Sequence, residues 1–345
     1  MGWQQTHRWR VHWFDKWERV LDDAVDSFPE HPHWPNVLLR ILFEVPSPDR
    51  KTIALVLDHG VPIAMVGLRI RGDWYMPLSQ YFIPDFLMVG KQELVGSVLM
   101  RLHVPLNVSW WRMLSEPPSS SRTVHTVRTR TAPHYVVDLT GDPEIHWRSS
   151  AHMKALRNIR NRCREFAFAV NPPGGAEWII RNWSKHWKIG PEEIEDRIVA
   201  ARYLEGLEKH YSLLLLDRGK VSAGTTFVVH RRELVALVTH RDESYDHYGT
   251  GTRLMDLAIQ WAKQSGFQRL DLGTTQSYKG RWAPISSQQW VMLEICPELY
   301  YRIHQLTSYG RRLRGMLHDN KLARCVFGWM PRRIKDIVTT PHGEH

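Results

Sequence analysis

A glycine hinge near residue 250 has the residue types and spacing of an anion-binding site. Tyr248-Gly249-Thr250-Gly251-Thr252 follows three apolar runs with strand character and precedes a stretch of helical periodicity over 251–265. The first N–H groups of a helix have no partner within that helix, and the helix dipole places positive potential at the same end. The hinge therefore predicts a backbone site for an anion, and the pyrophosphate of an acyl-coenzyme A is its natural occupant.

Two side chains near the hinge could take part in proton transfer. His240 ends the third apolar run, and an ordinary imidazole titrates close enough to neutral pH to take a proton from an amine. Asp271 lies between Leu270 and Leu272 in a predicted strand, where a buried carboxylate needs partners. We interpret both as candidate catalytic residues, although a salt bridge to an arginine explains Asp271 equally well.

A run of positive charge lies on the predicted helix 149–168, which also has an apolar face. Arg157, Arg160 and Arg164 follow the spacing i, i+3, i+7 and are expected on one side of this helix. The run has a single sign until Glu165. This pattern favours contact with an anionic donor or acceptor, and packing against acidic neighbours remains the alternative.

Composition limits the classes of protein to which the chain can belong. The chain has 345 residues, 43% of them hydrophobic, with a formal net charge of +10, which favours an anionic partner. The three cysteines lie far apart and predict neither a disulfide framework nor a metal site. No apolar run is long enough to cross a bilayer, and the N-terminus lacks an apolar region of signal-peptide type. A cytoplasmic protein is expected, with peripheral membrane contact as a further possibility.

The same order of elements is predicted twice along the chain. A hairpin over 52–70, a strand near 74–81, a helix over 92–102 and a strand over 106–110 form the first set. A hairpin over 212–229, a strand over 233–239, the helix 251–265 and a strand over 267–272 form the second. We interpret this repetition as a tandem duplication of one α/β fold.

The remaining segments complete the predicted organisation. Trp9, Trp13 and Trp17 follow helical spacing and predict an amphipathic helix over 9–21, and the Ser-, Pro- and Thr-rich segment 115–134 predicts a surface loop. Strands are predicted over 135–139 and 289–295, and helices over 176–189 and 191–209. The predicted domains are an N-terminal lobe (1–114), a linker (115–134), a C-terminal lobe carrying the donor site (135–297) and a basic helical tail (298–345).

The hinge and the segment after it resemble a known family. The stretch Gly249 to Ala262, then Gly266-Phe267-Gln268-Arg269-Leu270-Asp271-Leu272-Gly273, and then Tyr278-Lys279-Gly280-Arg281-Trp282, is similar to GNAT-type acetyltransferase domains of the CelD/FemAB-like group. The resemblance is good over 135–285 and weaker over 10–110. It implies two GNAT-like lobes, each a mixed and mostly antiparallel sheet flanked by helices.

The resemblance also implies an activity and a set of site residues. The expected reaction is transfer of an acyl group from an acyl-coenzyme A, without a metal, to an amine of a cell-envelope, polysaccharide or other small acceptor. Backbone amides near Val238 and Thr239 would stabilise the oxyanion, and Tyr278 would give a proton to the leaving thiolate. The candidate catalytic residues are thus His240, Tyr278 and Asp271; the candidate donor-binding residues are Val238, Thr239, Gly249, Thr250, Gly251, Thr252 and Lys279; and the candidate substrate-binding residues are Arg157, Arg160, Arg164, Arg281 and Trp282.

One position departs from the family pattern, and two other functions compete. Asp246 stands where related enzymes usually have Gln or Arg, and a carboxylate facing a pyrophosphate is unfavourable unless it points away. The first alternative is a FemAB-like aminoacyltransferase that uses aminoacyl-tRNA, which the positive net charge also suits. The second is a non-catalytic double-GNAT binding module at a membrane face.

Overall fold

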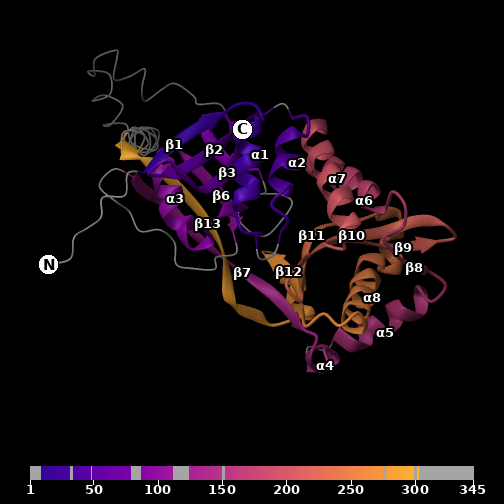
Figure 1. Ribbon diagram of the computed structural model, residues 1–345. Helices are drawn as coiled ribbons and strands as arrows, with labels where there is room; N and C mark the ends of the chain where they lie inside the picture. The colour runs from indigo at the N-terminus through magenta and orange to yellow at the C-terminus, as the bar shows by residue number, and fades with distance from the viewer. Residues whose placement is uncertain are drawn as a thin grey trace, which may run out of the picture.

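Thirteen strands form one continuous mixed sheet that extends through two lobes (Figure 1). The computed structural model describes residues 9–31, 34–47, 49–78, 87–111, 124–149, 152–274, 277–298 and 301–302. The strand order is β1-β2-β3-β4-β6-β13-β7-β12-β11-β10-β9-β8, and β5 pairs with β3 off this path. The fold is therefore of the predicted mixed α/β class.

The N-terminal lobe contains ten elements in the described residues. They are β1 (Trp9–Phe14), α1 (Arg19–Ser27), α2 (Leu38–Glu44), β2 (Arg50–Asp58), β3 (Val61–Arg71), β4 (Trp74–Pro77), β5 (Met88–Gly90), η1 (Gln92–Leu94), α3 (Val95–Arg101) and β6 (Leu106–Trp111).

The rest of the described chain contributes fourteen elements. They are β7 (Val124–Asp138), α4 (Glu144–Ser149), α5 (His152–Arg162), β8 (Ala167–Val170), α6 (Gly175–Trp187), α7 (Pro191–Gly206), β9 (His210–Asp217), β10 (Lys220–His230), β11 (Glu233–Arg241), η2 (Glu243–Tyr248), α8 (Thr250–Gln264), β12 (Arg269–Thr274), η3 (Ser277–Arg281) and β13 (Ile285–Pro297).

The repeated order of elements confirms two tandem GNAT-like lobes. In each lobe a hairpin leads to a third strand, a helix and a fourth strand parallel to the third: β4 pairs with β6, and β11 pairs with β12. The first hairpins also turn alike, since His59 and Gly60 have φ of +51° and +85° while Arg218 and Gly219 have +48° and +83°. Positive φ at two successive turn residues is the geometry that joins twisted antiparallel strands.

Two long strands join the lobes and correct one prediction. β7 pairs with β13 over most of its length and with β12 at its end, while β13 also pairs with β6 (Figure 1). The surface loop predicted over 115–134 is therefore wrong for residues 124–134, which lie in β7, and residues 115–123 lie outside the described residues. The Thr- and Arg-rich composition predicted a loop because the strands that pair with β7 lie far away in the sequence.

The amphipathic helix predicted over 9–21 is also wrong. Residues 9–14 form the edge strand β1, which pairs antiparallel with β2, and the helix α1 begins only at Arg19. A spacing of four residues satisfies a helical face and is also twice the period of a strand, so Trp9 and Trp13 fit both patterns. Trp9 and Val11 pack on the cluster that covers β2 and β3.

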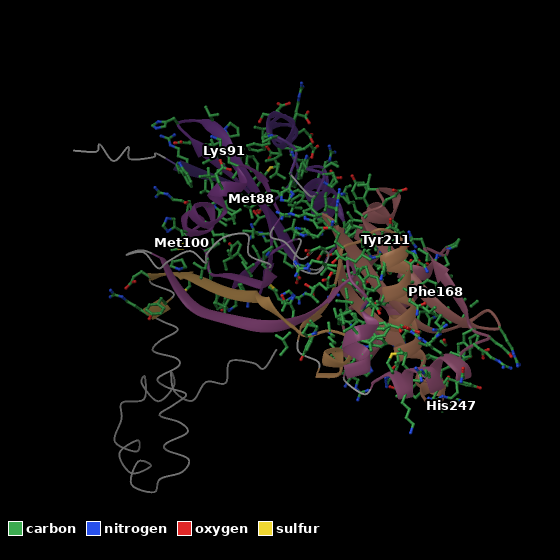
Figure 2. All side chains as sticks on the ribbon, turned by 90° about the horizontal axis from the view of Figure 1, so that it is seen from below. Met88, Lys91, Met100, Phe168, Tyr211 and His247 are labelled. Atoms are coloured by element: carbon green, nitrogen blue, oxygen red, sulfur yellow. The ribbon has the colours of Figure 1, made fainter. Side chains whose placement is uncertain are left out.

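A shared hydrophobic core holds the lobes against each other. One cluster combines Leu38 and Leu42 of α2 with Ala200 and Leu204 of α7, and it continues onto β10 and β11. Figure 2 shows side chains filling both lobes, with Met88 in the N-terminal lobe and Tyr211 in the C-terminal lobe. The C-terminal lobe therefore buries part of its own sheet with the help of the N-terminal lobe.

A buried ion pair crosses the same interface. The Lys51 Nζ on β2 lies 3.6 Å from Asp196 Oδ1 on α7, and both side chains are less than 10% exposed. Lys51 also donates to the carbonyls of Leu42 and Val45. Burial lowers the pKa of Lys51 and raises the pKa of Asp196, while their mutual attraction opposes both shifts.

Among the helices of the described residues, none is long and apolar enough to cross a membrane. The predicted basic helical tail falls almost wholly on residues 303–345, which lie outside the described residues.

The interlobe ion pair yields a stability prediction. Replacing Asp196 by Ala leaves the Lys51 ammonium buried without its counter-charge, so the free energy of unfolding should fall by about 3–5 kcal/mol in guanidinium denaturation. Asp23→Ala, on the exposed side of α1, is the matched control and should leave stability nearly unchanged. Equal midpoints for the two variants would show that the pair does not hold the lobes together.

Candidate functional site

The strands β11 and β12 pair for only three residues and then separate. The parallel register runs Glu233 to Arg269, Leu234 to Leu270 and Val235 to Asp271, and it stops there. Immediately beyond, the register of β11 with β10 shifts, which leaves Leu237 as the extra residue of a β-bulge. A bulge bends the strand that carries it. We call the opening between β11 and β12 after this point the fork.

The two predicted oxyanion donors lie on the bent part of β11, beside the fork. Val238 and Thr239 pair with Thr226 and Thr225 of β10, so one edge of β11 is occupied there. Their other edge faces the fork, and β12 has no register with it beyond Val235. The Thr239 hydroxyl lies 2.9 Å from the hydroxyl of the buried Thr225. The free edge of β11 at Val238 and Thr239 lies where a backbone donor for an oxyanion would be needed. That these amides have this role stays a prediction.

The predicted hinge is the start of α8. Gly249 has φ of +76° and is the N-cap, with no side chain capping the helix. Its N–H donates to the Asp246 carbonyl, and its own carbonyl accepts from the Arg253 N–H. In the part of the chain that the structure describes, residues 250–252 have no acceptor for their N–H groups, and the buried Thr250 hydroxyl has no hydrogen-bond partner. These are the properties of an anion site at a helix N-terminus.

Asp246 does not face the hinge as an unpaired carboxylate. Its two oxygens accept from Nε and Nη2 of Arg241 at 2.8 and 3.1 Å. The Cδ of Arg241 lies 3.4 Å from the point where a Cβ on Gly251 would stand. The ion pair therefore neutralises the charge of Asp246, the residue that departs from the family pattern. It also brings the guanidinium of Arg241 beside the N-terminus of α8.

Helix α5 supports the hinge from the other side. Arg162 Nη1 donates to the His247 carbonyl at 2.5 Å, and Cys163 Sγ lies 3.5 Å from the Tyr248 carbonyl. The Ile159 side chain lies 3.1 Å from the position of a Cβ on Gly249. Glycine is therefore required at 249 for its positive φ and also for space.

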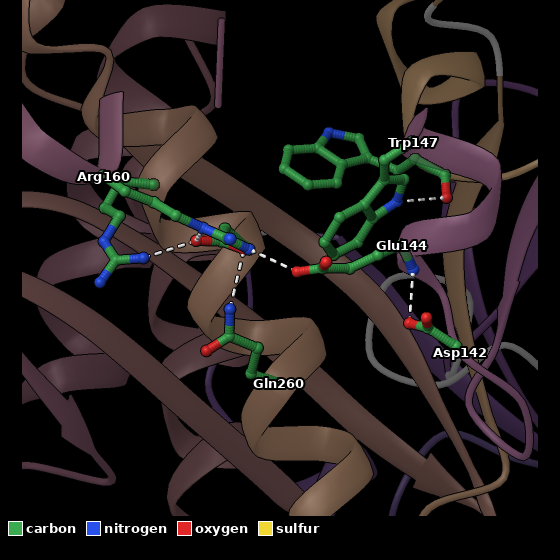
Figure 3. A network of polar contacts seen from close by, with 8 residues as sticks. Asp142, Glu144, Trp147, Arg160 and Gln260 are labelled. Atoms are coloured by element: carbon green, nitrogen blue, oxygen red, sulfur yellow. Dashed lines mark hydrogen bonds and ion pairs between the residues drawn. The ribbon is translucent and has the colours of Figure 1, made fainter. Parts of the chain in front are cut away.

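The predicted basic face of α5 is divided between an internal role and solvent. Arg160 donates to both oxygens of the fully buried Asp256 at 2.9 and 2.6 Å, and to Glu144 at 3.1 Å (Figure 3). These carboxylates raise the pKa of Arg160. Arg157 and Arg164 are exposed instead. Arg160 thus joins α5 to α8, and only the other two remain available to a ligand.

A second polar cluster lies at the fork. Asp271 Oδ2 lies 2.8 Å from His134 Nδ1, and Oδ1 accepts from the Gly273 N–H at 2.8 Å. Both side chains are about 1% exposed. The Lys279 Nζ lies 3.6 Å from the point where a Cβ on Gly273 would stand. Burial lowers the pKa of Lys279 to about 8, with Asp271 opposing the shift.

Three further predicted residues follow the fork in sequence. Tyr278 is 43% exposed, and partial burial of its hydroxyl raises its pKa against the opposing charge of Arg241. Arg281 is exposed. Trp282 is 3% exposed, packs edge-to-face on Trp147 at 5.1 Å and accepts the indole hydrogen bond of Trp147 (Figure 3). The structure therefore gives Trp282 a place in the core.

His240 lies on the opposite face of β11 from Arg241. Its ring is 5.5 Å from the ring of Trp178 on α6, in an edge-to-face arrangement. Burial is the main cause that lowers the pKa of His240; the neighbouring His186 and Arg241 add to this shift, and Asp242 and Glu243 oppose it. A small cavity under α6 and α7 reaches Leu237 and Val238 of the same strand. His240 and the hinge therefore approach the fork from two sides.

Sequence reasoning missed two residues of this site. Arg241 follows His240 on β11, and the alternation of strand side chains could have placed it with Thr239 on the side of α8. His134 was assigned to the predicted linker, and its partner Asp271 is 137 residues away, so no local pattern marks the pair. In the described chain, no group of three or more His, Cys, Asp or Glu side chains could hold a metal ion.

A family model covers this site. Residues 176–280 match the acetyltransferase (GNAT) domain, a range that runs from α6 through β11, the hinge and β12 to η3. No curated protein matches the chain. Within the C-terminal lobe, residues 176–280 thus match a GNAT acetyltransferase domain, in keeping with the CelD/FemAB-like resemblance and with an acyltransferase activity.

Solved structures with a similar fold have low sequence identity to this chain. L-PGS from Bacillus licheniformis is 13% identical, with 80% of this chain and 90% of that chain covered at a TM-score of 0.47. A tandem GNAT protein from the clavulanic acid biosynthesis pathway is 12% identical (84% and 98%, TM-score 0.46), and FemX is 9% identical (85% and 99%, TM-score 0.49). None of these likenesses identifies a substrate for this chain.

The network around Asp256 gives a prediction for α5. Asp256 also accepts from Arg253 and Gln260, so Asp256→Asn removes the charge that compensates two arginines (Figure 3). The free energy of unfolding should fall by about 3–5 kcal/mol, measured by chemical denaturation. Arg164→Ala, which removes an exposed arginine of the same region, should change it little. An Asp256→Asn variant that is no less stable than Arg164→Ala would contradict the internal role assigned to Arg160.

Proposed function

We propose, from the GNAT domain at residues 176–280, that this chain transfers an acyl group from an acyl-coenzyme A to an amine. The single observation that carries the proposal is the start of α8, where three N–H groups have no acceptor among the described residues and a neutralised Asp246 lies alongside. A diphosphate accepts such hydrogen bonds, and the helix dipole adds to the attraction. We further propose a cell-envelope, polysaccharide or other small amine as the acceptor.

The residues at the fork would supply the steps of the transfer. The bent part of β11 would present backbone N–H groups to the oxyanion that forms when the amine attacks the thioester. His240 would take a proton from the incoming amine, since burial lowers its pKa and so favours the neutral imidazole. Trp178 and His186 lie beside His240 on α6 and would line the acceptor side.

The C-terminal lobe is the better candidate for the active one. Its third strand, β11, is continuous over nine residues and its helix α8 has fifteen. In the N-terminal lobe, the corresponding partners of β3 are two short strands, β4 and β5, and the helix α3 has seven residues. A short helix offers a weaker dipole. The proposed boundaries of the lobes remain 1–114 and 135–297.

A second candidate function rests on the exposed charges beside the hinge. Arg157 and Arg164 are exposed on or just after α5, the helix that packs on the hinge, and Arg162 donates to the carbonyl of His247, just before the hinge. Positive charge beyond the immediate phosphate site favours a longer polyanion. Aminoacyl-tRNA is therefore the alternative donor, and a melting shift with tRNA but with no acyl-coenzyme A would favour it.

Donor binding should depend on Gly251. Acyl-coenzyme A should raise the melting temperature of the wild type by several degrees, because it binds the folded state. A Cβ on Gly251 meets only Arg241, so Gly251→Val should fold, yet its side chain would cover the N–H groups and weaken binding at least about tenfold. Gly206→Val, at a helical glycine with open space around it, is the matched control and should bind normally. Unchanged binding in Gly251→Val would remove the hinge from the donor site.

The protonation of His240 gives a second prediction. In an NMR titration, His240 should change charge below the ordinary imidazole value of 6.5, since burial and His186 both lower its pKa. His186→Ala should raise the pKa of His240 without restoring it fully, because the burial remains. Lys185→Ala, on the same helix, should leave it unchanged. A pKa above 6.5, or one that is indifferent to His186, would argue against His240 as a base at neutral pH.

A further inference from the structure

We infer that Lys279, rather than Tyr278, gives a proton to the sulfur that leaves the acyl group, an inference that rests on the proposed function. Tyr278 was the residue expected for this role. The two residues are neighbours on η3, but their environments differ.

The Lys279 amine lies at the base of the fork. The space in front of Gly273, which a Cβ would fill, is bordered by the Lys279 Nζ at 3.6 Å and by the Ala236 carbonyl at 3.9 Å. Ala236 is the first residue of β11 beyond its pairing with β12. Gly273 has φ of +76° and no side chain, so it leaves room for the amine at the point where the strands separate. An acyl thioester that passes through the fork toward His240 would bring its sulfur close to this amine.

The position and the pKa of Tyr278 suit the same step less well. Its side chain is 43% exposed, and the charge that acts on it is that of Arg241, which lies on β11 beside the hinge. Its pKa lies above the ordinary tyrosine value of 10.0. Lys279 has a pKa of about 8, close to that of an ordinary alkyl thiol at about 8.5. Proton transfer is most efficient between groups of similar pKa, so the ammonium matches a leaving thiolate better than the phenol does.

The step balances without any further reactant. The acceptor nitrogen forms a bond to the acyl carbon, the carbon–sulfur bond breaks, and its electron pair stays on sulfur. The ammonium of Lys279 gives one proton to that sulfur, and the acceptor amine loses one proton, which His240 takes and passes to solvent. Lys279 then recovers a proton from solvent. The charge of Asp271, which His134 holds, opposes the lowering of the Lys279 pKa, and at a pKa of about 8 most of the amine is protonated at neutral pH.

The inference can be tested with free coenzyme A, without knowledge of the acceptor. The ultraviolet absorbance of the thiolate is titrated in complexes of coenzyme A with the wild type, Lys279→Met and Tyr278→Phe, and complexes of desulfo-coenzyme A serve as blanks. A nearby positive charge favours the thiolate, so the wild type should lower the pKa of the bound thiol by about one unit relative to Lys279→Met. Tyr278→Phe should titrate like the wild type.

A second variant separates charge from proton donation. Lys279→Arg keeps the positive charge but does not give up its proton near neutral pH. It should retain the lowered thiol pKa, yet release thiol from acetyl-coenzyme A, with hydroxylamine as a small amine, on the order of 100-fold more slowly. Melting of each variant without ligand controls for folding.

The outcomes distinguish this inference from the proposed function. If neither coenzyme A nor desulfo-coenzyme A raises the melting temperature of the wild type, the proposed donor is wrong and the inference falls with it. If both bind but the thiol titrates alike in the wild type and in Lys279→Met, only the role of Lys279 is overturned. A change confined to Tyr278→Phe, or equal catalysed rates in the wild type and in Lys279→Arg, overturns it as well.

Discussion

The separation of β11 from β12 is the constraint on which the site depends. Parallel neighbours would normally continue their hydrogen bonds along the sheet, and here they stop after three pairs because the bulge at Leu237 turns β11 away. The bend exposes one backbone edge of β11, makes room for Lys279 in front of Gly273, and directs Arg241 toward α8 while His240 faces α6. Donor and acceptor sides therefore meet at one opening in a sheet that is otherwise continuous.

The hinge before α8 depends on charges that are already balanced. Asp246 would repel a phosphate, but Arg241 holds both of its oxygens and stands beside Gly251. Asp256, five residues further along α8, compensates Arg160 and Arg253 and thereby fastens α5 to α8. The free N–H groups of the helix start are thus held in a rigid frame, which is the arrangement that favours binding of an anion without reorganisation.

The sequence predicted the locally coded parts of this structure well. The paired hairpins, the helix α8 and the hinge follow from turn residues, periodicity and glycine spacing within short windows. Residues 9–14 were misassigned because a spacing of four fits a strand as well as a helix, and only the pairing with β2 decides. Residues 124–134 were misassigned because β7 is stabilised by β13, which is more than a hundred residues away.

The candidate site shows the same difference between residues that are close in sequence and residues that are far apart. The donor hinge was visible because its residues are contiguous, whereas the pairs Arg241–Asp246 and His134–Asp271 depend on the direction of side chains or on distant strands. Trp282 was assigned to substrate binding through the family resemblance, but it is buried in the core. For Arg160 the run of positive charge left ligand binding and packing against acidic neighbours both open, and the buried Asp256 decides for packing. Residue type alone does not tell a charge that faces solvent from one that holds two helices together.

The central claim is that the N–H groups of residues 250–252 bind the diphosphate of the donor. Amide hydrogen exchange at these three residues, resolved by NMR with and without coenzyme A, tests it most directly. Binding should slow exchange at all three amides and shift their resonances, while the opposite end of α8 should change little. Exchange at these amides that is indifferent to saturating coenzyme A would contradict the claim.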